Sequence, residues 1–200
     1  IYKLADSYCD HGHDHVGNNR GMENHPVIGF NYRISELHAA VGAAQTRKVP
    51  AIREANLKNK AILQKELSNV EGISFSKLGD DSGDSGTFLN ILMPDTETAK
   101  RTIDEFNKAG VGGFNYWYTN MYHFINQWEH IKGLKTASKL PIQLLGAPQD
   151  YNNLELPKTQ AVVGRLISFG IRCTWTEEEL KTLAAKISEC ATKAMKPVNA

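Results

Sequence analysis

Apolar and polar residues follow helical spacing in the first part of the chain, interrupted by one long polar segment. Residues 1–9 are predicted to form a short helix, and residues 10–33, rich in Gly, Asn, His and Asp, an ordered irregular loop. Ser35 is a predicted N-cap. The apolar and small residues that follow it at helical spacing are Leu37, Ala40, Val41 and Ala44. Pro50 should bend or restart this helix, which we expect to end near Asn69.

Strand-like and helical patterns alternate over the rest of the chain. Short apolar runs predict strands at residues 73–76, 87–93, 111–114 and 166–171. A helix should begin at Asp95 or Thr96 and end before Gly110, a natural left-handed terminator. Residues 176–179 form a capping box that opens a final amphipathic helix, whereas residues 133–157 look mostly irregular. This order predicts a compact α+β domain behind a long helix.

Composition and charge narrow the classes of protein. The chain has 200 residues, 41% of them hydrophobic, and a formal net charge of +1, which fits one domain or one domain plus part of another. The near-neutral charge gives no reason to expect nucleic acid or an anionic membrane as a partner, and no apolar run approaches the roughly 20 residues of a bilayer span. The start of the chain lacks the apolar core of a signal peptide. Because it begins within a helical pattern, we expect it to be the later part of a longer protein.

The cysteines indicate the compartment. Cys9, Cys173 and Cys190 stand at wide, irregular spacing, which predicts reduced thiols in a cytoplasmic protein rather than a disulfide framework. A carboxylate beside a thiol raises its pKa, so the neighbour Asp10 argues against Cys9 as a nucleophile. We interpret all three cysteines as structural.

The segment from Cys9 to His15 reads CDHGHDH and concentrates metal-ligating residue types. Three histidines at alternating positions could contribute to a zinc site, which uses three or four N, S or O ligands. No recognised ligand spacing accompanies them, however. We therefore favour a hydrogen-bonding loop near an interface or a ligand, with no metal.

Two further segments carry candidate binding chemistry. Asn31 and Arg33 stand just before a helix N-terminus, where backbone N–H groups and the helix dipole favour anions such as phosphate. The alternative is that they only pin the loop. The second segment mixes flat apolar rings with polar tips, which suits a sugar or another polyol, although plain packing explains it as well. Its members are Tyr116, Trp117, Tyr118, Asn120, Tyr122, His123 and Trp128.

The run from Gly29 to Gln45, GFNYRISELHAAVGAAQ, is long and specific. It resembles the G-x-N-Y-R-[MI]-S-E-[LM]-x-A-A-[IVL]-G-x-A-Q signature of the DegT-like sugar aminotransferases. Asp10-His11-Gly12 is similar to the family's D-H-G loop, and residues 171–179, IRCTWTEEE, look like its closing strand and final helix. The resemblance spans nearly all of the chain. CDHGHDH and the aromatic segment are further similar to members that aminate an 8-oxo derivative of 3,8-dideoxy-manno-octulosonate, a lipopolysaccharide sugar acid.

The resemblance implies the C-terminal half of a pyridoxal 5'-phosphate (PLP)-dependent transferase fold: a long linking helix, then a small domain with a mainly antiparallel sheet and flanking helices. It divides the chain into residues 1–34, the end of the large cofactor domain with an interface loop; 35–69, the linking helix; and 70–200, the small domain. The family's enzymes act as homodimers that move an amino group, usually from glutamate, to a keto-sugar. We expect the same here.

The resemblance also implies roles for particular residues. Asn31, supported by Arg33, would bind the phosphate of the partner subunit's cofactor. The residues expected to bind substrate are His11, His13, Tyr32, Trp117, Tyr118, Asn120 and His123. The family's Schiff-base lysine lies upstream of this segment, and no lysine here matches it, so we expect this chain alone not to transaminate. A sugar dehydratase with histidine in place of that lysine, or a non-catalytic oligomerisation or regulatory module, would also fit.

Overall fold

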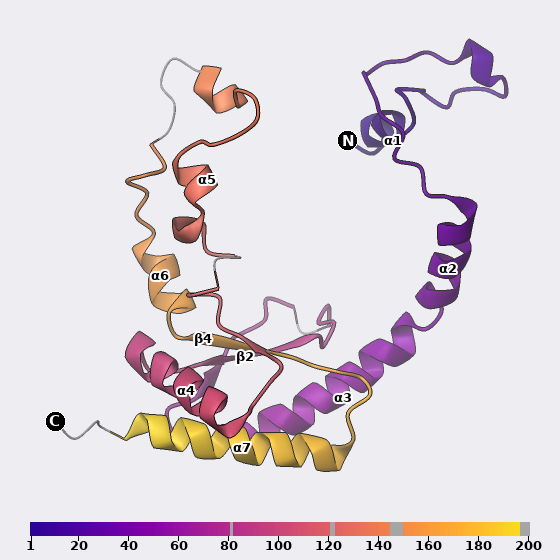
Figure 1. Ribbon diagram of the computed structural model, residues 1–200. Helices are drawn as coiled ribbons and strands as arrows, with labels where there is room; N and C mark the ends of the chain where they lie inside the picture. The colour runs from indigo at the N-terminus through magenta and orange to yellow at the C-terminus, as the bar shows by residue number, and fades with distance from the viewer. Residues whose placement is uncertain (81, 121–122, 145–149, 197–200) are drawn as a thin grey trace. The chain divides into compact units, whose positions relative to one another are not determined.

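The computed structural model describes residues 1–80, 82–120, 123–144 and 150–196 (Figure 1). The chain forms two compact units, residues 1–50 and residues 51–200. The three-part division expected from the resemblance stays a prediction. No helix in the described parts combines the length and the hydropathy that a membrane span requires.

The first unit contains two α-helices and one short 3₁₀ helix, joined by ordered loops. These are α1 (Tyr2–Cys9), η1 (Arg20–Met22) and α2 (Glu36–Thr46). Ser35 caps α2 as predicted, because its side chain accepts a hydrogen bond from the backbone N–H of His38. No residue of α2 is buried in this chain.

Helix α3 (Val49–Leu67) begins where the two units divide. Pro50 lies in its first turn, where a missing N–H leaves no helical hydrogen bond unmade, so the proline restarts the helix as predicted. The later turns of α3 bury Leu63 and Leu67 completely. The described helix ends at Leu67, two residues before the predicted end.

The second unit is built on a four-stranded antiparallel sheet. Its strands are β1 (Ser74–Phe75), β2 (Phe88–Leu92), β3 (Phe114–Asn115) and β4 (Leu166–Gly170), in the order β1-β2-β4-β3. Ile91 of β2 stands opposite Ile167 of β4. The last strand predicted from the sequence, β4, lies inside the sheet, between β2 and β3.

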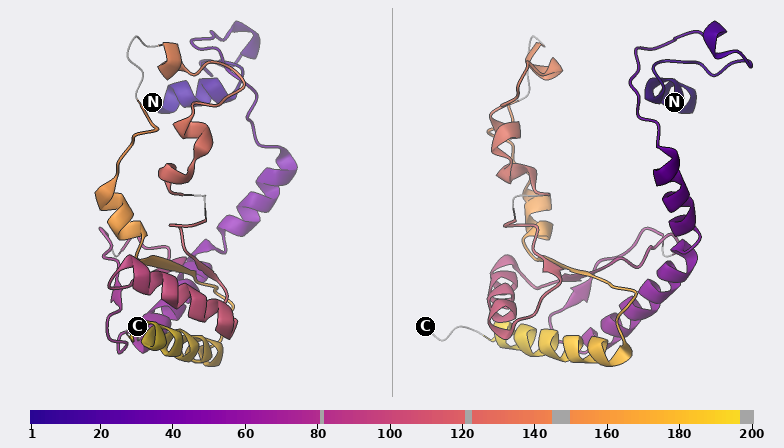
Figure 2. Two further views of the ribbon diagram at one scale, coloured as in Figure 1. Left: turned by 60° about the vertical axis from the view of Figure 1, so that its left-hand side comes forward. Right: turned by 45° about the vertical axis from the view of Figure 1, so that its right-hand side comes forward.

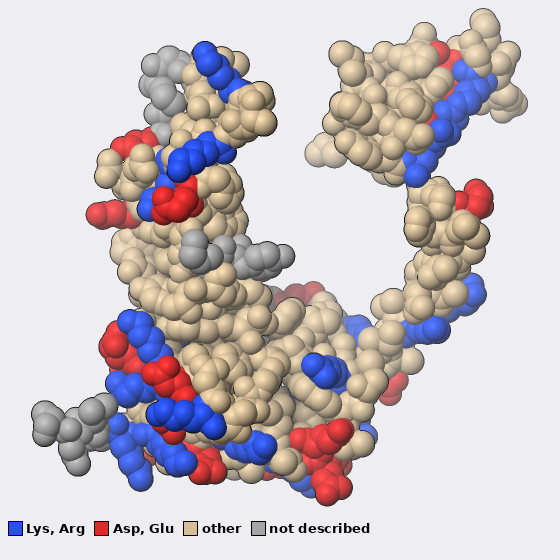
Figure 3. Space-filling view, viewed as in Figure 1, with Lys and Arg blue, Asp and Glu red and all other residues tan. Residues whose placement is uncertain are grey.

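Helices α4 (Thr96–Ala109) and α7 (Glu177–Met195) lie side by side, as both views of Figure 2 show. Asp95 caps α4, Gly110 ends it in the left-handed conformation, and the predicted capping box opens α7. Both helices pack into one core with the sheet and the end of α3. Fully buried members of this core are Leu63, Leu67, Ile91, Phe106, Ile167, Phe169, Leu180 and Ile187. Charged residues of both signs are interspersed over the outer faces of α4 and α7 (Figure 3).

Two details differ from the sequence prediction. Strand β3 begins at Phe114 rather than at Val111, because Gly112 and Gly113 precede it and Gly113 has a positive φ of 77°. Helix α6 (Pro157–Val163) was not predicted, although Pro157 at its first position is a normal helix start. Two short helical segments, η2 (Ile125–Gln127) and α5 (Glu129–Lys132), precede residues 133–157, and η3 (Pro141–Leu144) lies within that mostly irregular region.

The three cysteines are free thiols in the structure. Cys173 is exposed, Cys9 is half-buried and Cys190 is buried in α7. Burial raises the pKa of the Cys190 thiol. That shift disfavours the thiolate and fits the structural role predicted for this residue.

Candidate functional site

Backbone hydrogen bonds close the loop between α1 and α2 into a ring. Asp10 and Asn31 form an isolated antiparallel bridge. On either side of it, the His11 N–H donates to the Phe30 carbonyl at 3.0 Å, and the Tyr32 N–H donates to the Cys9 carbonyl at 2.9 Å. The D-H-G segment and the N-Y-R segment, twenty residues apart in the sequence, therefore lie directly against each other.

Two glycines permit this close backbone approach. A Cβ atom on Gly29 would meet the Gly12 nitrogen and would lie 2.8 Å from the Tyr8 carbonyl oxygen. Gly12 has a positive φ of 94°, and a Cβ there would meet the Val27 carbonyl oxygen. Only glycine fits both positions without moving backbone.

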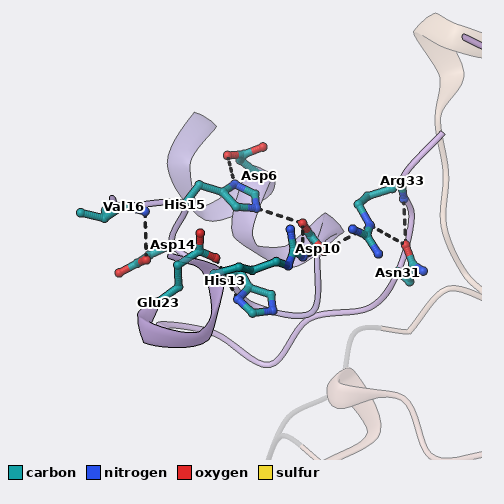
Figure 4. A network of polar contacts seen from close by, with 10 residues as sticks. Asp6, Asp10, His13, Asp14, His15, Val16, Glu23, Asn31 and Arg33 are labelled. Carbon is teal, nitrogen blue, oxygen red and sulfur yellow. Dashed lines mark hydrogen bonds and ion pairs between the residues drawn. The ribbon is translucent and has the colours of Figure 1, made fainter. Parts of the chain in front are cut away.

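Asp10 is the charged centre of the ring and is 4% exposed (Figure 4). Arg20 donates to its two carboxylate oxygens at 2.6 and 2.7 Å. His15 Nε2 lies 3.0 Å from Oδ2, and Arg33 Nε lies 3.2 Å from Oδ1. The hydrogen bond from Arg20, against the opposing effect of burial, and the contacts with His15 and Arg33 hold the pKa of Asp10 far below its usual range, so this carboxyl is ionised.

His15 lies between two carboxylates. Its Nδ1 is 2.8 Å from Asp6 Oδ2, and its Nε2 is 3.0 Å from Asp10 Oδ2. The hydrogen bonds with Asp6 and then Asp10 raise the pKa of His15 above its ordinary value of 6.5. His15 thus links the last turns of α1 to the centre of the ring.

Asn31 and Arg33 are exposed and contact each other. The backbone N–H and the Nε–H of Arg33 both donate to Asn31 Oδ1, at 3.3 and 3.2 Å. Two donors fix this atom as the amide oxygen, so the amide nitrogen of Asn31 faces away from them. No described residue accepts from that nitrogen or from the terminal nitrogens of Arg33. An outward amide N–H₂ beside a guanidinium fits a phosphate group.

The other predicted residues of this unit occupy different environments. His11 is exposed and adopts a left-handed backbone, with φ of 56°. His13 Nδ1 lies 2.9 Å from Glu23 Oε2, and its ring packs on His25 with centroids 4.3 Å apart. Tyr32 is 64% exposed. The loop therefore leaves His11 and Tyr32 accessible and engages His13 internally; their roles toward substrate stay predictions.

The described residues contain no group of three or more His, Cys, Asp or Glu side chains arranged to hold a metal ion. The histidines of CDHGHDH point to different partners instead. His13 pairs with Glu23, and His15 pairs with the two aspartates, whereas the His11 backbone joins the ring. His13 thus takes part in an ion pair, and His15 is hydrogen-bonded to the two aspartates.

The aromatic segment of the second unit follows β3 directly, as expected. The Trp117 indole N–H donates to the buried Ser168 Oγ at 3.0 Å, and the ring meets His123 edge-on at 4.5 Å. Tyr118 is half-buried and stacks on Phe124 at 5.8 Å. Asn120 and His123 are exposed. These residues stay candidates for sugar binding, and Tyr122 lies outside the described residues.

Two aromatic residues of the segment have packing roles. Tyr116 is 6% exposed, and its hydroxyl donates to the Gly164 carbonyl at 2.6 Å, so it belongs to the core. Burial raises its pKa to about 12. Trp128 is half-buried and stacks on His130 at 6.0 Å. Tyr116 is therefore unavailable to a sugar, and packing explains its presence.

Sequence patterns assigned no role to Arg20. They considered His15 only as one of three possible metal ligands, and Asp10 only as the neighbour of Cys9 and as part of the D-H-G segment. The contacts among these three residues form only when the loop closes into the ring, and sequence periodicity does not predict them. The one available signal is the density of opposite charges within a short glycine-containing loop. Such a loop predicts ion pairs without saying which residues form them.

The geometry of both units corresponds to known structures. The 3-amino-5-hydroxybenzoic acid synthase structure matches with a TM-score of 0.64 and 18% identity, over 96% of this chain and 47% of that one. AtS13 from Actinomadura melliaura matches with a TM-score of 0.65 and 19% identity, over 94% and 44%. Helicobacter pylori PseC, an aminotransferase involved in the biosynthesis of pseudoaminic acid, matches with a TM-score of 0.62 and 16% identity, over 94% and 45%. At these identities the likeness establishes the fold.

The predicted α+β fold is confirmed, and it matches part of an aminotransferase fold. Residues 1–188 match the model of the DegT/DnrJ/EryC1/StrS aminotransferase family, and the chain belongs to that family. Its aminotransferases depend on PLP. The chain spans less than half the length of the solved structures it matches.

Proposed function

We propose that this chain is part of a PLP-dependent sugar aminotransferase and supplies the turn that binds the cofactor phosphate. The observation that carries the proposal is the orientation of Asn31: its amide oxygen is held by Arg33, so its N–H₂ group is presented outward next to a guanidinium. PLP, when bound, supplies the electron sink for amino transfer. Asn31 and Arg33 would hold its phosphate and thereby orient the ring.

We further propose that the phosphate belongs to the cofactor of a partner subunit in a homodimer. Helix α2 supports this proposal because its apolar side chains are uncovered: Leu37 is 82% exposed and Val41 is 60% exposed. Between Glu36 and Arg47, α2 has no charged residue, and small residues that permit close helix contact surround the apolar ones (Figure 3). A face of this kind suits burial against a second copy.

The proposed reaction transfers an amino group from glutamate to a keto-sugar. The finer proposal is an 8-amino-3,8-dideoxy-manno-octulosonate transaminase of lipopolysaccharide sugar synthesis, and it rests on the resemblance of CDHGHDH and the aromatic segment. His11, His13 and Tyr32 would contribute to substrate binding in this proposal. Trp117, Tyr118, Asn120 and His123 would do the same from the second unit.

The test uses the full-length protein and the substitution Asn31→Asp. Aspartate keeps an acceptor for the two Arg33 donors but replaces the outward N–H₂ with a carboxylate oxygen, which repels phosphate. The readout is the affinity of the cofactor-free protein for PLP divided by its affinity for pyridoxal, which has no phosphate. We expect this ratio to fall about tenfold or more, because a hydrogen bond to a charged group is lost.

Asn24→Asp is the matched control, because Asn24 lies in the same loop. Within the described parts of the chain, only its backbone carbonyl is hydrogen-bonded, and it accepts from the Asp14 N–H. It should leave the ratio unchanged. An unchanged ratio in Asn31→Asp would refute the phosphate role. Incubation with glutamate addresses the reaction class, since an aminotransferase releases 2-oxoglutarate, whereas a dehydratase or a non-catalytic module releases none.

A further inference from the structure

The proposed phosphate-binding turn does not stand alone, because a network of charged residues extends behind it. We propose that Asp10 positions Arg33 and Asn31 for the phosphate, and that His15 secures Asp10 in this task only while both of its ring nitrogens carry protons. This inference rests on the proposed function of Asn31. It assigns positioning roles to two residues that do not themselves face the phosphate.

The first step of the argument is the chain of contacts from Asp10 to Asn31. Arg33 Nε forms an ion pair with Asp10 Oδ1 at 3.2 Å, and its N–H donates to Asn31 Oδ1 at 3.2 Å, so the guanidinium contacts both oxygens (Figure 4). The ion pair with Asp10 and the hydrogen bond to Asn31 together fix the orientation of the guanidinium. The hydrogen bond also keeps the Asn31 oxygen turned inward and its N–H₂ group outward.

The second step is the fixed position of Asp10 itself. Its backbone is bridged to Asn31, and its side chain is 6% exposed. Arg20 binds both carboxylate oxygens, and His15 binds Oδ2. A buried carboxylate with this many donors has one orientation available, so it can act as a rigid anchor for Arg33.

The third step concerns charge. Arg20, Arg33 and protonated His15 face the carboxylates of Asp6 and Asp10, and the charge of Glu23 also acts on Arg20, so positive and negative charges balance over the network as a whole. Arg33 lies at the end of the network next to Asn31. The attraction for an anion therefore comes from the position of Arg33 and not from a net charge of the network.

The fourth step is the protonation state of His15. Both ring nitrogens face carboxylate oxygens, and an ionised carboxylate only accepts hydrogen bonds. A neutral imidazole would turn one lone pair toward an oxygen lone pair. The groups facing His15 are Asp6 from α1 and Asp10 from the loop, with Arg20 of η1 and Arg33 beyond Asp10. The contribution of His15 is therefore complete below pH 6.5 and is lost as the pH rises through its raised pKa.

The test is Asp10→Asn in the full-length protein, with the ratio of PLP affinity to pyridoxal affinity as the readout. Two explanations predict opposite signs. If Asp10 acted only through its charge, removing that charge would strengthen phosphate binding. If Asp10 positions Arg33 and Asn31, the ratio should fall. The loss of one charge-assisted hydrogen bond to the PLP phosphate would lower it about tenfold.

Asp14→Asn is the matched control, because Asp14 is in the same loop and, among the described residues, its side chain accepts only from the nearby Val16 N–H. It should leave the ratio unchanged. Circular dichroism of each variant establishes that the protein is folded. If Asp10→Asn does not fold, the conservative His15→Gln variant carries the test. Both donors of glutamine are on one nitrogen, unlike the two separate N–H groups of the imidazolium, and glutamine does not titrate.

His15→Gln tests the pH dependence. In the unaltered protein the ratio should fall as pH rises from 6.5, because PLP phosphate is already largely ionised there while His15 loses its proton. In His15→Gln the ratio should be lower at pH 6.5 and should no longer change through the range in which His15 titrates. An identical pH profile for both proteins would overturn the role of His15.

The outcomes separate this inference from the proposed function. If Asn31→Asp lowers the ratio and Asp10→Asn leaves or raises it, phosphate binding stands and the positioning role of Asp10 is wrong. If Asn31→Asp has no effect, the proposed function itself fails. A fall in both variants, with unchanged ratios for both controls, is the expected result.

Discussion

The hydroxyl of Tyr116 offers a quantitative test of the packing of the second unit. It donates to the Gly164 carbonyl at 2.6 Å, and both residues are buried. Tyr116→Phe removes only the oxygen atom, so the ring still fills its place in the core. The Gly164 carbonyl then loses this donor in a setting that water does not reach, and leaving such a group without a partner costs about 1–3 kcal/mol.

The ionisation of Tyr116 gives a second magnitude. Its pKa is raised from an ordinary 10.0 to about 12, chiefly by burial. As the pH rises, the unfolded chain therefore loses this proton before the folded chain does. The free energy of unfolding is unaffected by Tyr116 ionisation below pH 10 and falls as the pH approaches 12. At about 1.36 kcal/mol for each unit of pKa, the loss reaches at most about 2.7 kcal/mol. Tyr116→Phe should remove this contribution to alkaline destabilisation.

Amide hydrogen exchange of β4 is the appropriate assay, because it reports the opening of this unit alone within the full-length protein. Exchange near neutral pH should give a lower opening free energy for Tyr116→Phe by about 1–3 kcal/mol. Tyr118→Phe is the matched control. The hydroxyl of Tyr118 accepts an exposed hydrogen bond from Gln160 at 3.3 Å, so its loss should cost less than about 1 kcal/mol.

The ionisation is measured separately, by the difference in ultraviolet titration between the unaltered protein and Tyr116→Phe. The residue missing from the variant should titrate near pH 12. Equal exchange in Tyr116→Phe and the unaltered protein, together with titration of the missing residue at 10.0, would refute the reasoning.

Two further substitutions test features of the chain that the sequence pattern and the structure share. Gly29→Ala places a methyl group against the backbone of Gly12, so we expect the free energy of unfolding to fall by about 1–3 kcal/mol and PLP binding to weaken. Gly21→Ala is the control, because a Cβ there would make only an ordinary contact, and it should have little effect on either quantity. Thr176→Ala removes the cap of α7, whose hydroxyl accepts from the Glu179 N–H, and should reduce the protection of α7 amides from exchange by about 1 kcal/mol.

The helices and strands were largely predictable because local chemistry determines them. Ser35, Asp95 and Thr176 cap the helices that their positions predicted, and Gly110 ends α4. The central strand β4 was visible as an apolar run. Ser168 interrupts that run yet is 2% exposed, since Trp117 covers it by a hydrogen bond from another segment. Periodicity carries no information about such a contact.

The candidate site was only partly predictable, for a related reason. Asn31 and Arg33 belong to a long signature and could be identified by resemblance. The residues behind them could not, because Asp10 reaches Arg33 only after the chain between them has closed into a ring. Sequence separation hides the contact, and the sequence of CDHGHDH does not show which residues its histidines pair with.

The ring also explains why its two glycine-containing segments form one functional unit. Gly12 and Gly29 permit the backbones to meet, and the Asp10–Asn31 bridge follows from that approach. The bridge places the carboxylate of Asp10 beside the side chain of Arg33, which in turn holds the oxygen of Asn31. A substitution at either glycine should therefore disturb the proposed phosphate-binding turn, which neither glycine is proposed to form, and it should do so even where the helices α1 and α2 remain intact.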